Sequence, residues 1–489
     1  MGLYKSLFRQ TAIYGFATVL PRMLTFFLTP FYTQILPEAE YGEVSIIFAY
    51  MIFFNVVLAY GMETSFFRFY SREENKEVVT ETSTVSIFWS ALLFLGGALL
   101  FRNAVAGFIG IDVQYITFAI WILVLDALVI IPFAKLRVNR KPGHYAVIKT
   151  GNVLVNIGLN IFLLVFLPRL ASADSTGIFS FFYIENFEIG YIFLSLLVSS
   201  FLTFVVLSGN YIRFNWNFDF ALWKKMMRYG LPILISGIAF AINEQFDKIL
   251  LEWLLPADIA KSEVGVYSAC YKLGLFMILF RTAYTLGIEP FFFSYSHNKN
   301  ATQTYATVTK YFIVFGSLIQ LAVIVFADLL KVLLLRDPAY WEAMKIVPLI
   351  VLANFFLGIY TNLSVWYKLI DKTHIGAYIS IMGAVITLAL NFILIPHYSY
   401  YGSAIATIAA YGSMMLVSWY LGNKHYPIPY EIGKISAYLG LSIVFSIISF
   451  YFFRGNYFVG IPLLLSFVAF IYSNERQVID KILTRKTNT

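Results

Sequence analysis

Two stretches far apart in the sequence share one pattern, YGMETSFFRFYS at residues 60–71 and LGIEPFFFSYS at residues 286–296. Each contains Gly-x-Glu, then a run of aromatic residues, and closes on Tyr-Ser. Each also lies at the end of a long apolar segment. The echo predicts two equivalent helix ends in a chain that repeats itself.

The composition places these segments in a membrane. Of the 489 residues, 60% are hydrophobic and 13% are charged, with a mean hydropathy of +0.75. A soluble chain carries about a quarter charged residues. No soluble core could bury so much apolar surface, whereas a lipid bilayer can. The sequence therefore predicts an all-α polytopic membrane protein, because helices satisfy their own backbone hydrogen bonds in hydrocarbon.

Apolar segments of about 20 residues, the length that spans a bilayer as a helix, recur along the chain. They predict fourteen spans, with these limits: 11–35, 42–67, 79–101, 113–134, 146–167, 189–208, 229–251, 264–294, 312–330, 346–367, 375–395, 401–421, 435–453 and 457–473. The positive charges agree with this count. With both termini inside, 23 of the 35 Lys and Arg residues fall in cytoplasmic segments and seven in outer ones, as the positive-inside rule requires.

The two halves carry the same landmarks in the same order. Tyr41-Gly42-Glu43-Val44 opens the second span of the first half, and Val264-Gly265-Val266-Tyr267 opens its counterpart. Asn160 in VNIGLNIFLLVFLP (155–168) matches Asn391 in VITLALNFILIPH (385–397). Six spans separate the members of each pair, so the repeats share one orientation, with a substrate site expected between two lobes. We expect six-helix lobes at 1–210 and 211–421, and an extra helix pair with a basic cytoplasmic tail at 422–489.

These landmarks resemble the multidrug/oligosaccharidyl-lipid/polysaccharide exporter superfamily, in particular its bacterial polysaccharide-biosynthesis flippase branch. The resemblance lies in EYGEVSIIF, GMETSFFRFYS, VGVYSACYKLG and LNFILIPHYSYYGSAIAT (390–407), and covers most of the first twelve spans. It implies a fold like that of the multidrug exporters in this superfamily. It also implies that undecaprenyl-diphosphate-linked oligosaccharide crosses the bacterial cytoplasmic membrane by alternating access. Polysaccharide polymerases and glycosyltransferases are further candidate partners.

Arginine and lysine within the spans are candidates for binding a diphosphate. Arg22 lies deep in the first span directly after Pro21, and Arg281 lies near the middle of the eighth span. Guanidinium stays protonated and offers planar, bidentate donors to phosphate oxygens. Lys272 precedes Arg281 by nine residues, about half a turn around an ideal helix, so we rank it as a weaker candidate.

Acidic residues in the spans are candidates for coupling or gating. Asp126 lies mid-span in the fourth helix, where it could balance Arg22 or carry a coupling proton. Glu63 and Glu289 belong to the echoed motif and could cap a gate at the cytoplasmic rim. Pairing with Arg68 or another nearby basic group is the structural alternative, which we slightly favour.

Two other function classes compete with the flippase. A cation-coupled small-molecule exporter of the same superfamily is the main alternative, although its usual form has twelve spans. A membrane glycosyltransferase or polymerase is disfavoured, because the chain has no Asp-x-Asp, no large outer loop and no nucleotide-binding Gly-x-x-x-x-Gly-Lys-[Ser/Thr]. With a single cysteine and no His-x-x-x-His spacing, we expect no metal site and no cofactor. We also expect no nucleic-acid partner, and a membrane-lipid environment throughout.

Overall fold

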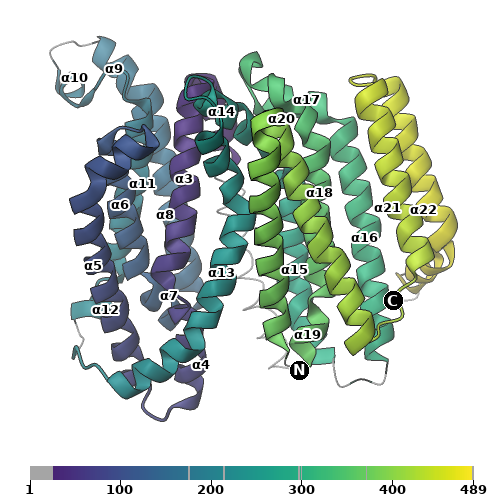
Figure 1. The fold of residues 1–489 in the computed structure, drawn as a ribbon, viewed down its shortest axis with the longest axis horizontal. Coiled ribbons are helices and arrows are strands. Elements are labelled where there is room, and N and C mark those ends of the chain that lie inside the picture. Colours follow the sequence, from purple (N-terminus) through teal and green to yellow (C-terminus); the bar gives the residue numbers. More distant parts are fainter. Residues whose placement is uncertain are drawn as a thin grey trace. The chain divides into compact units, whose positions relative to one another are not determined.

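The computed structural model describes residues 26–173, 177–212, 215–295, 298, 300–370 and 372–486. Every regular element in this part of the chain is a helix (Figure 1). The chain divides into two compact units, residues 1–265 and residues 266–489. The all-helical fold class expected from the composition is therefore confirmed.

Twelve helical segments among the described residues are long and apolar enough to cross a membrane. Two features relate this number to the fourteen predicted spans. The first predicted span, 11–35, lies mostly outside the described residues and is represented by α2 (Leu28–Ile35). The 53-residue α20 (Thr373–His425) covers two predicted spans, 375–395 and 401–421. Its backbone leaves the helical region at Ser399, three residues after Pro396, since a proline removes a backbone donor and bends a helix.

Unit 1 begins with α2 and includes the helices that carry the first of the echoed motifs. Its further helices are α3 (Glu38–Ala59), α4 (Met62–Arg72), α5 (Lys76–Ile109), α6 (Val113–Leu128), α7 (Ile130–Val138), α8 (Pro142–Ile161), α9 (Leu167–Ala173), α10 (Ile178–Phe182), α11 (Glu188–Leu207), α12 (Gly209–Ile212) and α13 (Phe220–Leu254), with a π-helical turn η1 (Phe162–Phe166) between α8 and α9. The core is built where α6 packs on α3, α5 and α11, and α8 packs on α11. The next helix, α14 (Ala260–Tyr271), crosses the boundary between the units.

The first echoed motif breaks its helix. Tyr60 and Gly61 both adopt left-handed backbone angles, with φ of 31° and 72°, so α3 ends at Ala59 and α4 starts at Met62. A side chain at Gly61 would also collide with α13, because an added Cβ would lie 2.4 Å from the carbonyl oxygen of Gly230. Glycine at this position thus permits both the turn and the close contact.

Unit 2 contains the helices that follow the boundary. They are η2 (a 3-10 turn, Lys272–Gly274), α15 (Leu275–Tyr295), α16 (Ala301–Val325), α17 (Ala327–Leu334), η3 (Pro338–Ile346), α18 (Val347–Leu363), α19 (Val365–Leu369), α20, α21 (Ile432–Ile447), η4 (a π-helical turn, Ile448–Phe452) and α22 (Tyr457–Lys486). The most extensive packing joins α18 to α20, while α16 contacts α18, α21 and α22. The extra helix pair expected at 435–473 is present as α21 and α22 (Figure 1).

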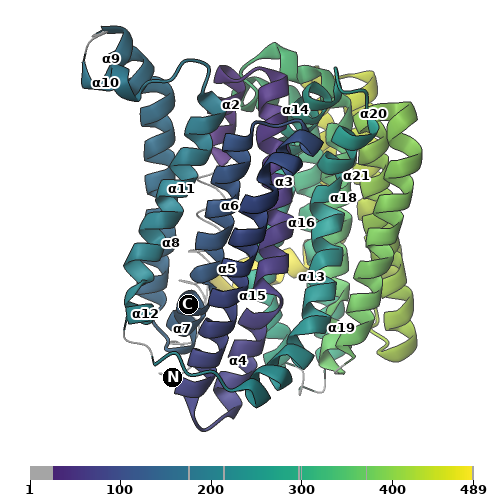
Figure 2. The same ribbon diagram turned by 60° about the vertical axis from the view of Figure 1, so that its left-hand side comes forward.

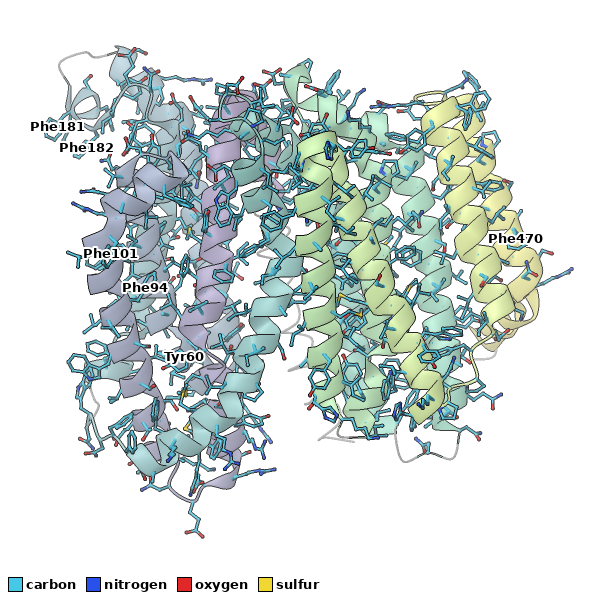
Figure 3. The ribbon with its side chains drawn as sticks, in the orientation of Figure 1. Tyr60, Phe94, Phe101, Phe181, Phe182 and Phe470 are labelled. Carbon is cyan, nitrogen blue, oxygen red and sulfur yellow. The ribbon has the colours of Figure 1, made fainter. Side chains whose placement is uncertain are left out.

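The connection between α8 and α11 contains α10, which projects with α9 beyond the body of unit 1 (Figure 2). Phe181 and Phe182 of α10 point away from the unit, as does Phe101 of α5 (Figure 3). Their exposed fractions are 83%, 59% and 61%. Exposed aromatic side chains of this kind suit the membrane and its interface with water.

The boundary between the units does not coincide with the boundary predicted from the repeat. By the repeat, α13 starts the second lobe, yet it packs along α3, α4 and α5 within unit 1. Packing and sequence duplication are different properties, so the division at residues 210 and 211 stays a prediction.

Candidate functional site

Arg281 lies on α15, where the sequence predicts a cation in the middle of a span. It is partly buried. Its side-chain stem lies beside Gly358 of α18, since a Cβ added to that glycine would be 3.5 Å from Arg281 Cγ. Arg281 therefore runs along the surface between α15 and α18, which pack on each other.

A small cavity with a mostly apolar lining begins one turn further along α15. Its volume is about 10 Å³, room for about one water molecule. Asn362, which helps to line it, is only 5% exposed, and its Oδ1 atom accepts no hydrogen bond from the described residues. The cavity is lined by Tyr284, Thr285, Ile288, Phe292, Thr361, Asn362, Val365 and Lys368. Arg281 and the cavity together form a region rich in polar donors and acceptors along α15, α18 and α19.

The structure says less about the other predicted site residues, Lys272, Arg22 and Glu289. Lys272 lies in the 3-10 turn η2 and is exposed. This turn interrupts the regular helix before Arg281, so the half-turn separation expected on an ideal helix does not apply. Arg22 lies outside the described residues, as does the side chain of Glu289.

Asp126 lies in the interior of unit 1 and contacts the neighbouring α11. Ser200 Oγ donates a hydrogen bond of 2.9 Å to Asp126 Oδ1. Lys149 of α8 is the cation that acts electrostatically on Asp126, and its Nζ lies 4.3 Å from the centre of the Phe133 ring. The arrangement gives the partly buried carboxylate one donor and one nearby opposite charge, a setting in which an intramembrane acid is usually functional or paired.

The two asparagines matched by the repeat are both fully buried and bond their own helices alike. Asn160 Nδ2 donates to Asn156 O at 2.8 Å, and Asn391 Nδ2 donates to Thr387 O at 2.7 Å. Their oxygen atoms differ, since Asn160 Oδ1 accepts from Tyr32 OH at 2.8 Å. Asn391 Oδ1 has no such donor among the described residues. Asn354, Asn362 and Asn474 donate to the fourth preceding carbonyl in the same way, so this bond does not distinguish the repeat pair and the repeat stays a prediction.

Glu63 forms an ion pair at the start of α4. Arg137 Nη1 donates to Glu63 Oε1 at 2.7 Å, with both side chains more than two-fifths exposed. The guanidinium of Arg137 also lies 4.7 Å from the Phe67 ring centre. Arg68 instead lies over the ring of Tyr229, at 4.1 Å. Glu63 thus has the helix-end pairing that we considered as its structural alternative, although the partner is Arg137.

A buried ionic cluster in unit 2 was not predicted from the sequence. Lys310 Nζ lies 3.0 Å from Glu431 Oε1 and 3.1 Å from Glu475 Oε2. Tyr311 and Tyr438 also donate to Glu475, at 3.0 and 3.1 Å. Lys310 is 5% exposed and Glu475 3%. The signal in the sequence was Glu475 itself, an acid at the end of the last apolar segment.

A second ionic contact lies at the connection between α21 and α22. Arg454 donates to both carboxylate oxygens of Asp328, with its Nε 3.1 Å from Oδ2 and its Nη2 3.1 Å from Oδ1. Lys331 Nζ lies 2.5 Å from Asp328 Oδ1. Burial favours the neutral form of Asp328, but the hydrogen bonds from Lys331 and Arg454 outweigh it and lower the pKa of this carboxyl.

Comparison with known protein families identifies the chain's relatives. The model of a family described as polysaccharide biosynthesis protein matches residues 7–277, more than half of the sequence. The chain belongs to this family. Functionally curated protein sequences give no match.

Solved structures show the same fold. The lipid II flippase MurJ, in an inward closed conformation, aligns with a TM-score of 0.73 at 15% identity, covering 95% of this chain and 99% of that one. An inward-facing multidrug resistance MATE family transporter of the MOP superfamily aligns with a TM-score of 0.61 at 14% identity, covering 88% and 95%. A MOP superfamily transporter from Pyrococcus furiosus aligns with a TM-score of 0.59 at 13% identity, covering 89% and 96%. The chain is thus a multi-pass membrane protein that shares the fold of these transporters.

Proposed function

We propose that this protein is a flippase that moves undecaprenyl-diphosphate-linked oligosaccharide from the cytoplasmic to the outer leaflet of the bacterial cytoplasmic membrane by alternating access. Membership of the polysaccharide biosynthesis family and the MOP transporter fold support this proposal. In this proposal, both termini are cytoplasmic. The repeat lobes are residues 1–210 and 211–421, and residues 422–489 form the extra helix pair and tail.

The observation that carries the substrate class is the position of Arg281. It is a partly buried guanidinium in the middle of an apolar helix, one turn from a cavity that Lys368 and Asn362 help to line. A guanidinium in a low-dielectric setting matches a diphosphate better than it matches a cationic drug. We assign the diphosphate to Arg281, with Arg22 and Lys272 as further cations. Lys368, Thr361 and Asn362 would donate to or accept from the polar head group.

Asp126 is the residue we propose for coupling. Its carboxylate is inside unit 1, where it accepts a hydrogen bond from Ser200 and interacts with the charge of Lys149. A proton or cation bound there would weaken the attraction between Asp126 and Lys149. Glu63 and Glu289 are proposed for the cytoplasmic rim. For Glu63 this role would require its ion pair with Arg137 to open.

Complementation of a bacterial strain that lacks its own oligosaccharide flippase tests the proposal. Arg281→Gln should reduce export of the polysaccharide by more than about tenfold, as expected for loss of a charge-assisted contact. Arg281→Lys should restore it only in part, because lysine keeps the charge but not the planar fork. The amount of each variant in the membrane is measured in parallel.

Arg102→Gln is the matched control. Arg102 is exposed on α5, and its loss should leave export unchanged. Full export by Arg281→Gln at normal abundance would contradict the diphosphate site and would favour the cation-coupled exporter.

A further inference from the structure

The segment that leads from α12 into α13 carries exposed aromatic side chains and, directly after them, exposed cations. The aromatic residues, with exposed fractions of 44%, 43% and 64%, are Trp216, Phe218 and Phe220. The exposed cations in the first turns of α13 are Lys224, Lys225 and Arg228. These turns lie beside α4 and α5, at a clear angle to the rest of α13 (Figures 1 and 2).

Hydrogen bonds hold one side of this segment against α5. Thr82 Oγ1 accepts from Asp219 N at 3.2 Å, and Ser86 Oγ accepts from Trp223 Nε1 at 2.9 Å. The Asp219 carboxylate is also engaged within the segment, because its Oδ1 accepts from Leu222 N at 2.9 Å and so caps α13. The segment therefore has a fixed position on α5, and its open side faces away from that helix.

The two sides of the first turns of α13 differ in character. Leu222 and Met226, four residues apart, are buried where α13 packs on α4 and α5. Phe220, Lys224 and Arg228 are also spaced by four, so they form one row along the exposed side of the helix. The open side therefore presents an aromatic ring and positive charges to the same surroundings.

The cations of this row have no counter-charge within the described part of the chain. Neither Lys224 nor Lys225 nor Arg228 forms an ion pair with another described residue. The neighbouring Arg68 of α4 differs, since its guanidinium lies 4.1 Å from the centre of the Tyr229 ring. An anion outside the protein can therefore approach all three charges of α13.

The segment lies at the level where a membrane meets water. Ser86, which bonds Trp223, belongs to the inner turns of the predicted span 79–101, and the nearby Trp89 is 62% exposed. Aromatic side chains gather at this level of a bilayer. A helix start with aromatic rings and cations on its open side can place the rings among the upper acyl chains and the cations among the head groups.

We propose that residues 216–228 form a binding surface for anionic phospholipid. The exposed rings insert between the acyl chains near the head groups, and the three cations of α13 bind the lipid phosphates. A soluble acidic partner would match the cations but not the exposed rings beside the end of a span. In the proposed orientation, the bound lipids belong to the cytoplasmic leaflet. The inference goes beyond the proposed transport function and does not depend on the substrate.

A fluorescent reporter on the purified full-length protein tests this surface. The parent carries Cys270→Ala, which removes the natural cysteine, and Ala221→Cys labelled with the environment-sensitive dye NBD. Ala221 is exposed and lies between Phe220 and the cations. The protein in neutral detergent is titrated with phosphatidylglycerol, and the rise in NBD fluorescence gives the apparent affinity. Phosphatidylcholine, which has no net charge, is the reference lipid.

Replacing the cations should weaken the binding of phosphatidylglycerol and leave that of phosphatidylcholine unchanged. The triple variant Lys224→Gln, Lys225→Gln, Arg228→Gln should lower the apparent affinity by more than about tenfold, because each cation near an anionic surface contributes about fivefold. The matched control removes three exposed cations from α4 and from the connection between α7 and α8, by Arg72→Gln, Arg140→Gln and Lys141→Gln. Its affinity should stay within about twofold of the parent, because charges far from the surface are screened.

Two further measurements separate the rings from the charges. Phe220→Ser should weaken the binding of both lipids alike, because it removes an apolar contact and no charge. Raising the salt concentration on the parent should weaken the binding of phosphatidylglycerol alone. The salt measurement needs no further substitution, so it decides the role of charge even if the triple variant fails to fold.

The same reporter in nanodiscs distinguishes lipid from a soluble partner. A spin label on the lipid head group should quench NBD at Ala221→Cys, whereas iodide in the water should quench NBD at Ser71→Cys, an exposed position at the end of α4. Stronger quenching at Ala221→Cys by iodide than by the lipid would overturn the proposal and favour a soluble acidic partner. Equal affinities of the parent for the two lipids, or an equal loss in the control variant, would also overturn it.

Discussion

At the crossing of α3 and α14, two helices meet through bare glycine backbone at Gly42 and one partly exposed ion pair, whereas α16 holds α21 and α22 through buried charges. On the α16 side, Lys310 lies between two carboxylates, and Glu475 accepts hydrogen bonds from two tyrosines as well. At the connection between α21 and α22, two nitrogen atoms of Arg454 donate hydrogen bonds to the carboxylate of Asp328. The two attachments lie roughly 27 Å apart along α16 and α17.

The two contacts differ in the free energy that is needed to separate the helices they join. A buried charge that loses its partner is left uncompensated in a medium of low dielectric constant, so a contact such as Lys310–Glu475 cannot open at modest cost. Glycines that separate expose only backbone already bonded within its own helix. The contact between α16 and α22 is therefore the costlier of the two to separate.

The largest effect should come from breaking the buried pair. Lys310→Met alone should destabilise the protein by about 3–5 kcal/mol, because it leaves the buried Glu475 without a cation. Glu475→Gln should cost less, because Lys310 keeps its ion pair with Glu431 at 3.0 Å. The double variant Lys310→Met, Glu475→Gln should lose less than the sum of the single losses, since neither charge then remains. Thermal unfolding of the purified protein in detergent measures all three.

Lys434→Met is the control, because its ion pair with Glu431 is exposed and should contribute less than about 1 kcal/mol. If Lys310→Met and Glu475→Gln unfold at the wild-type temperature, the Lys310–Glu475 pair is not needed to hold α22 against α16. The contact between α16 and α22 would then be no harder to separate than the contact between α3 and α14.

An intermediate effect is expected at the other end of α3. Gly61 and Gly110 both have left-handed backbone, with φ of 72° and 68°, so alanine strains both equally. A Cβ at Gly61 would lie 2.4 Å from Gly230 O, whereas one at Gly110 would meet nothing within 4 Å. Gly61→Ala should therefore destabilise the protein by about 1–3 kcal/mol more than Gly110→Ala, the cost of overpacking.

Thermal unfolding of the two variants gives this difference directly. Equal losses of stability in Gly61→Ala and Gly110→Ala would mean that the backbones at Gly61 and Gly230 can move apart at little cost. In that case the contact at Gly61 would hold α3 no more firmly than the contact at Gly42 at the other end of the helix.

Gly61 also shows which features of the fold can be predicted from the sequence and which cannot. Hydropathy and charge bias predicted the helical membrane fold and the positions of the spans, because chain length and burial in lipid act on each segment separately. The echoed motif predicted equal roles for Gly61 and Gly287. The chain instead turns at Gly61 and continues as helix through Gly287 in α15. The backbone conformation depends in part on a partner, Gly230, that no local pattern identifies.

The candidate site was predictable to a similar degree. A mid-span arginine is visible in any hydropathy profile, so Arg281 could be found from the sequence. The neighbouring cavity could not, since Lys368 and Asn362 reach α15 only when α18 and α19 pack on it. The ion pairs of Lys310 could not be predicted for the same reason, because only the fold brings Glu431 and Glu475 to it.

The smallest effect concerns acid and the connection between α21 and α22. Lys331 and Arg454 lower the pKa of Asp328 despite its partial burial, so this carboxyl stabilises the fold above its unfolded pKa of about 3.9. That contribution disappears as the pH falls through the lower, folded pKa. The melting temperature of the wild type should therefore exceed that of Asp328→Asn at pH 7, and the difference should begin to shrink below about pH 4 and vanish below the folded pKa. Glu342→Gln, at an exposed position in η3, controls for the loss of one negative charge and should match the wild type. A constant difference between wild type and Asp328→Asn down to pH 3 would mean that the carboxylate acts through packing alone. The buried cluster around Lys310 would then be the single electrostatic attachment of the helix pair among the contacts described.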